Sequence, residues 1–415
     1  MTDKVLYLKF DRMSQPIELI GCASLLEHFP SIFPGWIIEQ VEAVNQSPVL
    51  SVTRDKDIFT MEASWLEKPI RRKDKVNAIC ALVAELIRAY VNDHGDLLCL
   101  HGAAAEFCGR LVVFPSLYRA GKSVLSTCLA SSGIPLFCDD VIPMSLSERR
   151  GIAPGLAPRL RLPLPENLTP ETRNFIDAHS GLRGKHYLYL DIDGAGLVAR
   201  GQQLPIGAFV LLKREAGTEA RFENVSEAEV LHQVVWQNFS REVDAPRILE
   251  VLSQLVADAK LYRLCYDRAE DAAELLCREF DSWPTQQQKK GSKSKSGNQL
   301  KELNAHLRPG YYLRNPDICI LQVDNQSFLA DREGARIHQL NSIGTAVWSL
   351  LAEPVTRIEM VDLLCSAYPE PGRSQIDGDV VCLLKDLDAK NLLLSGDGPS
   401  SSVPNKPPVK IGPVV

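Results

Sequence analysis

The 415-residue sequence predicts a mixed α/β chain built from two unlike modules. A strand pattern, a loop ending in Gly-Lys-Ser and a helix pattern, all within residues 97–129, predict a large α/β module. Three strand patterns followed by three helix patterns, within residues 306–395, predict a small α+β module. Between them, residues 284–299 read PTQQQKKGSKSKSGNQ and hold no aliphatic or aromatic side chain. Such a segment has nothing to bury, so we expect a flexible linker.

Composition excludes several classes of protein. Lys and Arg number 46 against 52 Asp and Glu, and the net charge of -6 argues against coating nucleic acid or an anionic membrane. The 11 cysteines form no C-x-x-C pair, which is typical of a reducing compartment. The first residues, MTDKVLYLKFDRM, lack a signal-peptide pattern, and no apolar run is long enough to span a membrane. We therefore expect a cytoplasmic protein with neither nucleic acid nor membrane as its partner.

The large module begins with a segment rich in strand patterns. Alternating apolar residues predict strands at Val5–Phe10, Trp36–Val41 and Val49–Thr53, and apolar residues at helical spacing predict a helix over Lys75–Asn92. The predicted organisation is a β-rich subdomain (1–75), an α/β nucleotide-binding domain (76–282), a linker (283–303), a small domain (304–396) and a disordered tail (397–415).

Residues 116–123 read SLYRAGKS and indicate a phosphate-binding loop. Gly121 allows the backbone to approach phosphate oxygens, and the following helix start directs N–H groups at an anion. Lys122 would reach the β- and γ-phosphates, and the Ser123 hydroxyl would complete a Mg²⁺ ligand set. Ser116 stands where the usual pattern has its first glycine, which is a departure from it. The candidate nucleotide-binding residues are Ser116, Arg119, Ala120, Gly121, Lys122, Ser123 and Val124.

Acidic and imidazole side chains accompany this loop. A short apolar strand pattern ends in Asp139-Asp140, where a carboxylate serves as base or metal ligand in phosphate-binding folds. If the chain forms a hairpin about Cys108-Gly109, antiparallel pairing places His101 opposite position 116, at the mouth of the loop. The alternative is a pair of turn-forming aspartates and a structural histidine.

These motifs resemble the HPr kinase/phosphorylase family across most of the α/β domain. The resemblance implies a P-loop fold of that family with ATP and Mg²⁺ as cofactors. It implies that Asp139 is the catalytic base, with His101 near the γ-phosphate and Lys122 on the phosphates, and that Ser123 and Asp140 ligate Mg²⁺. It leaves open which aspartate is base and which is ligand, and whether ATP or GTP is used. The signature for reverse phosphorolysis is not recognisable, which favours a kinase alone. Further candidate phosphate contacts, or else solvated surface cations, are Arg159, Arg161 and Lys185.

The small module has its own pattern. Its predicted elements are strands at Tyr311–Arg314, Ile318–Val323 and Ser327–Asp331, a turn at Asp324-Asn325, and helices at Ile343–Leu351, after Thr356 and at Asp379–Leu394. Leu340-Asn341 before a helix that carries Trp348 resembles the PqqD family, small winged-helix-like modules that recognise the leaders of ribosomally made, modified peptides. The resemblance implies a leader lying between an edge strand around Phe328–Asp331 and the third helix. The candidate peptide-binding residues, unless they face the core, are Phe328, Leu329, Val380 and Leu384.

Together the two modules predict an ATP-dependent kinase that phosphorylates a Ser or Thr hydroxyl of a ribosomally synthesised precursor peptide. The small module would hold the leader, and the linker would keep the acceptor residue at high effective concentration near the kinase site. Two alternatives remain open. The first is an inactive, nucleotide-responsive peptide-delivery protein, which the substitution by Ser116 favours. The second is ATP-dependent activation of the peptide for elimination or cyclisation. A homo-oligomer is also left open.

Overall fold

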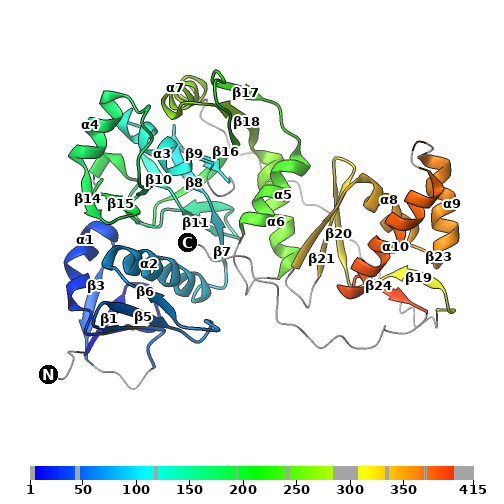
Figure 1. The fold of residues 1–415 in the computed structure, drawn as a ribbon, viewed down its shortest axis with the longest axis horizontal. Coiled ribbons are helices and arrows are strands. Elements are labelled where there is room, and N and C mark those ends of the chain that lie inside the picture. Colours follow the sequence, from blue (N-terminus) through cyan, green and yellow to red (C-terminus); the bar gives the residue numbers. More distant parts are fainter. Residues whose placement is uncertain are drawn as a thin grey trace. The chain divides into compact units, whose positions relative to one another are not determined.

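The structure is a computed structural model that describes residues 5–42, 47–115, 120–192, 194–238, 244–283, 307–331, 336–368, 370 and 372–396. These residues fall into two compact units: unit 1 lies within 1–243 and 251–284, and unit 2 within 244–250 and 285–413. The chain is a mixture of helices and several β-sheets (Figure 1). Apart from Trp283, the predicted linker lies outside the described residues, as does the predicted tail. No described helix is both long enough and apolar enough to cross a membrane.

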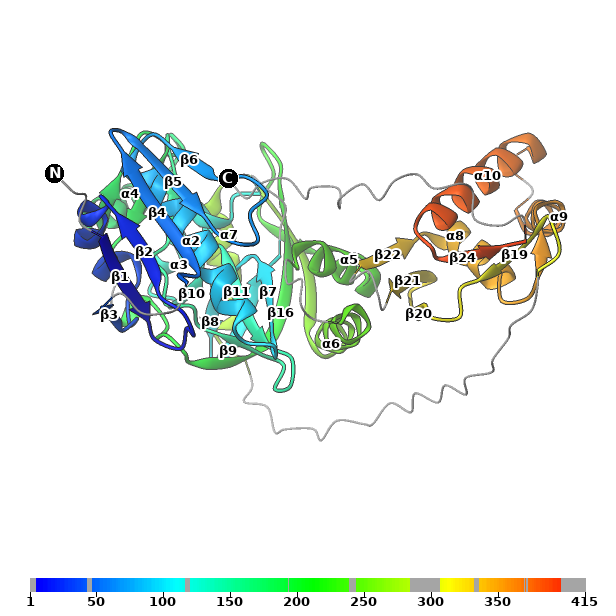
Figure 2. The same ribbon diagram turned by 90° about the horizontal axis from the view of Figure 1, so that it is seen from below.

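Unit 1 begins with a six-stranded sheet in the order β3-β1-β2-β4-β5-β6. Its strands are β1 (Val5–Phe10), β2 (Ile17–Ile20), β3 (Ile38–Val41), β4 (Leu50–Asp55), β5 (Ile58–Glu62) and β6 (Ile70–Arg72), with η1 (Ala23–His28) and α1 (Phe29–Ile32) between β2 and β3. Helix α2 (Lys75–Asn92) has the predicted bounds, and Asp74 caps it by accepting a hydrogen bond from the Asn77 N–H. It contacts β5 and β6 on one side and strand β7 of the next sheet on the other (Figure 2).

A nine-stranded sheet follows, in the order β10-β8-β9-β16-β12-β11-β7, with β18 beside β16 and β17 beside β18. Its strands are β7 (Leu97–His101), β8 (Ala103–Phe107), β9 (Arg110–Phe114), β10 (Leu136–Cys138), β11 (Val141–Ser145), β12 (Arg150–Ile152), β16 (Gln203–Arg214), β17 (Arg221–Glu223) and β18 (Lys260–Tyr266). Strand β16 runs parallel to both β9 and β18. The helix that follows β9, α3 (Lys122–Ser131), packs on β8 and therefore begins at the edge of this sheet.

Three of the remaining elements of unit 1, β13 (Arg159–Arg161), α4 (Pro170–Ala178) and α7 (Ala269–Phe280), contact α3. A three-stranded sheet has the order β13, β15 (Tyr187–Leu190), β14 (Ser180–Arg183). The other helices are η2 (Gly194–Gly196), α5 (Glu227–Gln237) and α6 (Ala245–Asp258, whose first turns belong to unit 2). Helices α4 and α7 pack against α3 (Figure 1). Helix α3 is thus enclosed on several sides, which holds its first residues in one place.

The hairpin about Cys108 and Gly109 is present, and both residues have the positive φ of a tight turn, 51° and 75°. Ala103 lies opposite Phe114 in this hairpin, and the chain breaks at Gly102 into two strands. Strand β7 pairs with β11, so that His101 lies opposite Val141. The Gly102 N–H donates to the Asp140 carbonyl at 2.9 Å, which fixes this break. The predicted partner position, 116, lies outside the described residues.

Within residues 307–396, the described part of unit 2 forms two three-stranded sheets, β23-β19-β24 and β20-β21-β22, and three helices. Its elements are β19 (Tyr311–Arg314), β20 (Cys319–Val323), β21 (Gln326–Asp331), β22 (Arg336–Leu340), α8 (Ser342–Leu350), β23 (Val355–Thr356), α9 (Arg357–Ala367), α10 (Arg373–Ala389) and β24 (Leu393–Ser395). The Asp324-Asn325 turn is confirmed by positive φ at both residues. Asn341 caps α8 by accepting from the Gly344 N–H at 2.8 Å, and Trp348 is buried in the core. The Leu-Asn…Trp pattern therefore specifies a helix start and a core residue.

Two predictions for unit 2 are wrong. The strand around Phe328–Asp331 is not an edge strand, because β21 pairs with β20 on one side and β22 on the other. The third helix begins six residues earlier and ends five residues earlier than Asp379–Leu394. The chain turns at Asn391, whose φ is 55°, and the apolar residues beyond it form β24, paired with β19. The residues of β24 thus form a strand because they pair with a distant strand, although their apolar spacing is also compatible with a helix.

Candidate functional site

The first candidate site lies at the start of α3. Gly121 is the N-cap residue with φ of 91°, and Lys122 is the first helical residue, so Ser123 and Val124 lie in the first turn. The Tyr266 hydroxyl, at the end of β18, donates to the Ala120 carbonyl at 2.9 Å. The residues Ala120 to Val124 thus form a helix start whose free N–H groups suit an anion. The two other predicted nucleotide-binding residues, Ser116 and Arg119, lie outside the described residues.

Asp139 and Asp140 lie in the turn between β10 and β11. Asp139 is buried, and its Oδ2 accepts a hydrogen bond from the Arg159 main-chain N–H at 2.8 Å. The side chain of Asp140 is one-third exposed and makes longer contacts: Oδ1 lies 3.3 Å from His101 Nδ1, and Oδ2 lies 3.4 Å from Arg159 Nη2. The fold therefore brings residues from β7, β10–β11 and β13 together, with one carboxylate held tightly and the other loosely.

Burial shifts the ionisation of this cluster. It raises the pKa of Asp139 to about 7, and repulsion from Asp140 adds to the rise, while Arg159 and the Ser123 side chain oppose it through hydrogen bonds. Burial lowers the pKa of Lys122, although the attraction of Asp140 and Asp139 favours its charged form. A carboxyl group that changes protonation near neutral pH suits a general base. Lys122 is the complementary cation, since both carboxylates act on it.

Burial also lowers the pKa of His101, with Asp140 opposing the shift and the cations Lys122 and Arg159 adding to it. The ring is therefore disposed to be neutral at pH 7. A neutral imidazole can donate or accept a hydrogen bond without adding charge, so His101 suits an orienting role beside Asp140.

The residues present fit Mg²⁺ in one way only. In the described part of the chain no three His, Cys, Asp or Glu side chains come together as a metal site. Asp139, Asp140 and the Ser123 hydroxyl supply hard oxygen donors, but too few for a cage made of protein alone. Mg²⁺ in phosphate-transferring proteins is held by one or two carboxylates together with substrate phosphates. Ser123 and Asp140 would therefore hold the ion jointly with a bound phosphate.

Two residues of this cluster were missed or left undecided by the sequence. Arg159 was a candidate cation without a position, and pairing of β13 with β15 brings it beside both aspartates. Tyr266 lies 146 positions from Ala120 and has no motif around it. Arg161 and Lys185 remain exposed at the surface. Neither Arg159 nor Tyr266 could be assigned earlier, since each reaches the site through strand pairing over a long sequence separation.

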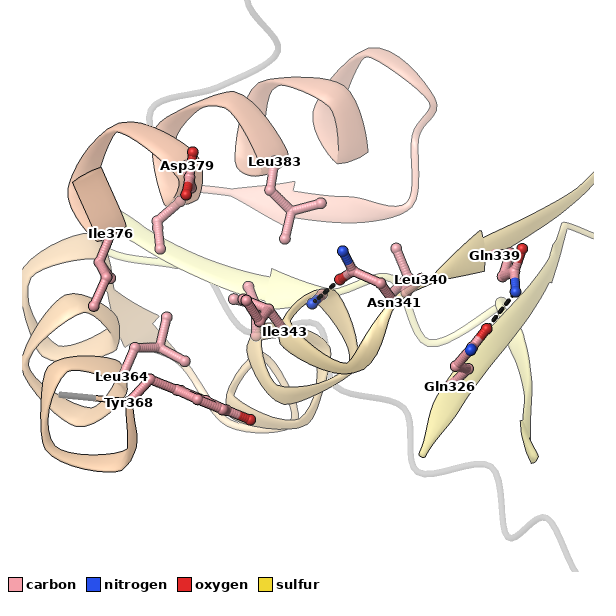
Figure 3. Close-up of a pocket in the computed structure, with 13 residues that line it drawn as sticks. Gln326, Gln339, Leu340, Asn341, Ile343, Leu364, Tyr368, Ile376, Asp379 and Leu383 are labelled. Atoms are coloured by element: carbon pink, nitrogen blue, oxygen red, sulfur yellow. Dashed lines mark hydrogen bonds between the residues drawn. The ribbon is translucent and has the colours of Figure 1, made fainter. Parts of the chain in front are cut away.

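The second candidate site is a pocket of about 630 Å³ in unit 2. Figure 3 shows that side chains of α8, α9 and α10 converge on it, with the end of β22 at one side. Its lining is Gln326, Gln339, Leu340, Asn341, Ile343, Gly344, Val347, Leu364, Tyr368, Ile376, Asp379, Val380 and Leu383. The only charged side chain in this lining is Asp379, and most of the rest is apolar. Such a pocket is large enough for two or three apolar side chains of an extended peptide.

Only one of the four predicted peptide-binding residues lines this pocket. Val380 lines it, whereas Phe328, Leu329 and Leu384 do not. Phe328 and Leu329 are fully buried in the central strand β21, and Leu384 is buried in the core. For these three the structural reading is the correct one. The lining residues Gln339 and Leu340 belong to β22, an edge strand of its sheet in the described part of unit 2.

Comparison with known families identifies part of this unit. Residues 326–393 match the family of coenzyme PQQ synthesis protein D (PqqD). This part of the chain is a PqqD domain. The match includes β21, β22, the three helices and thus the whole pocket lining. A solved structure of TbiB1 in complex with the TbiA(beta) leader peptide is similar at 26% identity over 20% of this chain and 93% of that chain, with a TM-score of 0.19. Comparison with curated proteins gives no match.

Proposed function

We propose that the protein is an ATP- and Mg²⁺-dependent kinase that phosphorylates a Ser or Thr hydroxyl of a ribosomally synthesised precursor peptide. The observation that carries the proposal is the convergence of Lys122, at a helix N-terminus, with the Asp139-Asp140 pair in one buried cluster. The same chain holds a PqqD domain with an apolar pocket. A phosphate-binding cluster and a peptide-recognition domain on one chain fit the modification of a peptide by phosphoryl transfer.

In the proposed reaction Lys122 and the α3 N-terminus neutralise the phosphates, which is most of what phosphoryl transfer requires of a protein. Asp139 accepts the proton of the peptide hydroxyl as its oxygen bonds to the γ-phosphorus and the bond to ADP breaks. Its firm hydrogen bond to the Arg159 N–H suits a base whose position must not change. The longer contacts of Asp140 suit a group that rearranges to bind a cation. Ser123 and Asp140 would hold Mg²⁺, which would supply positive charge to offset the charge of the phosphates.

The leader would bind at the PqqD domain. PqqD-like modules recognise leader peptides, and the pocket beside β22 supplies the means: main-chain bonds along an edge strand and apolar contacts beneath it. Asp379 adds a preference for a leader with a basic residue near its apolar anchors. This moves the proposed binding strand from β21, which is paired on both sides, to β22.

The test is incubation of the full chain with ATP, Mg²⁺ and the small peptide encoded by the neighbouring open reading frame. The expected product carries one phosphate by mass, and Lys122→Ala is expected to reduce transfer by about 10²–10³-fold. Lys260→Ala is the control, because Lys260 begins β18, at the opposite end of that strand from Tyr266, and pairs with Glu279. Transfer by Lys122→Ala at the wild-type rate would overturn the mechanism. Peptide binding without a mass change indicates a delivery protein, and loss of water indicates activation for elimination or cyclisation.

A further inference from the structure

The two aspartates of the cluster are held in different ways. Asp139 accepts from the Arg159 main-chain N–H at 2.8 Å, a contact that does not depend on the Arg159 side chain. Each oxygen of Asp140 instead has one long contact to a side chain, with His101 at 3.3 Å and Arg159 at 3.4 Å. Contacts of this length are weak hydrogen bonds. Arg159 thus serves the first aspartate through its backbone and the second through its guanidinium.

The Arg159 guanidinium is positioned for one further partner. It lies 4.7 Å from the centre of the Tyr187 ring, which supports its flat face, and its side chain is 19% exposed. A guanidinium has five N–H donors in a fixed plane, and Asp140 and the Cys80 side chain each accept from this one. Donors therefore remain for a further acceptor. The guanidinium and the His101 ring both contact the Asp140 carboxylate, so they belong to the same cluster.

We propose that Arg159 is an exchangeable counter-cation of Asp140: it competes with the divalent cation for this carboxylate in the empty site and transfers to the nucleotide phosphate in the loaded site. The inference rests on the proposed function and names the regulation of its site. A phosphate brings acceptor oxygens that bind a guanidinium more strongly than one distant carboxylate oxygen does. Asp140 then becomes available as a ligand. Binding of the nucleotide consequently strengthens binding of the metal, and a cation binds only weakly to the site without nucleotide.

The first test is Mn²⁺ binding to the full chain without nucleotide, measured by electron paramagnetic resonance of the free ion. Asp140→Asn is expected to abolish the binding and so defines the site. Arg159→Gln is expected to bind Mn²⁺ about fivefold to tenfold more tightly than wild type, because a positive charge beside the ligand is removed. Arg161→Gln is the matched control: it removes the same charge from the same strand, over the same Tyr187 ring at 5.7 Å, and leaves Mn²⁺ affinity unchanged.

The second test is ATP binding in the presence of Mn²⁺, measured by calorimetry. Arg159→Gln is expected to bind ATP about tenfold more weakly than wild type, because the guanidinium that would contact the phosphate is absent. The two affinities therefore change in opposite directions. A merely structural role would weaken both together. Arg159→Lys, which keeps the charge but not the planar fork, is expected to return Mn²⁺ affinity to the wild-type value and ATP affinity only in part.

The outcomes separate this inference from the proposed function. Unchanged or weaker Mn²⁺ binding by Arg159→Gln overturns the role of Arg159, as does Mn²⁺ binding that survives Asp140→Asn. Wild-type protein that binds no ATP overturns the proposed function instead. In that case the Mn²⁺ series still decides whether Arg159 competes for Asp140.

Discussion

Gly121 is constrained twice. Its φ of 91° is in the left-handed region, and a Cβ added there would lie 2.7 Å from the Tyr266 hydroxyl oxygen. The first constraint is conformational and the second is steric, so the residue cannot carry a side chain without movement of its surroundings. Tyr266 thereby restricts position 121 to glycine and also donates a hydrogen bond to the preceding residue, Ala120.

We expect Gly121→Ala to lower the free energy of unfolding by about 2 kcal/mol and to abolish ATP binding. In a Tyr266→Phe background the same substitution is expected to cost about 1 kcal/mol less, because the clashing hydroxyl is gone. Chemical denaturation of the four proteins of this double-mutant cycle measures the difference. Equal costs in both backgrounds would show that the hydroxyl does not restrict position 121.

His338 in β22 gives unit 2 a pH dependence. Burial, with Lys390 and Arg336 adding to it and Asp331 opposing, lowers its pKa from 6.5 to about 4. The unfolded chain therefore takes up a proton before the folded one does, and stability is lost as the pH falls from about 6.5 to about 4. Between about pH 7 and pH 5 the thermal midpoint of wild type is expected to fall more than that of His338→Gln. Parallel falls in the two proteins would contradict this.

At the scale of elements, local patterns were good guides where local chemistry determines the structure. The helix Lys75–Asn92, the Cys108-Gly109 and Asp324-Asn325 turns and the Thr356 cap are as predicted, since each depends on residues a few positions apart. Short strands such as β12 and β23 have too few residues for a pattern. The division into β7 and β8, and the central place of β21, depend on partners far along the chain.

Helix α9 tests the local level directly. The Thr356 hydroxyl accepts from the Glu359 N–H at 3.3 Å, and the Glu359 carboxylate accepts from the Thr356 N–H at 2.8 Å, which is a capping box. We expect Thr356→Ala to destabilise unit 2 by about 1 kcal/mol. Glu359→Gln keeps an acceptor for the Thr356 N–H and is expected to cost less than about 0.5 kcal/mol. Denaturation experiments that find the reverse order would exclude the capping box as the cause.

At the scale of the whole molecule, the proposal assigns chemistry to unit 1 and recognition to the PqqD domain. Different substitutions should then impair capture of the leader and transfer of the phosphate. Substitution in the pocket affects capture of the leader, whereas substitution in the cluster affects transfer of the phosphate. Tethering the leader raises the effective concentration of the acceptor without altering the barrier of the chemical step.

We expect Ile343→Asp to raise the KM for the precursor about tenfold or more with kcat little changed, because a charge is placed in the apolar pocket. Its control is Ile358→Asp: both isoleucines are exposed and lie in unit 2, but Ile358 does not line the pocket. Steady-state kinetics with the intact precursor measure both variants. Equal effects of the two substitutions, or a fall in kcat alone, would argue against leader capture at this pocket.

The sequence by itself predicted two modules, the residue types of the cluster around Lys122 and Asp139, and a PqqD resemblance over residues 306–395, which the family comparison confirms over residues 326–393. These features depend on local motifs, since a helix cap or a Gly-Lys-Ser loop is formed by residues a few positions apart in the sequence. The tertiary structure alone decided that His101 contacts Asp140, that Arg159 serves both aspartates and that Tyr266 closes on Gly121. It also decided that β22, and not β21, is an edge strand in the described part of unit 2. The reason is that strand order joins distant segments, and no local pattern encodes which segments pair.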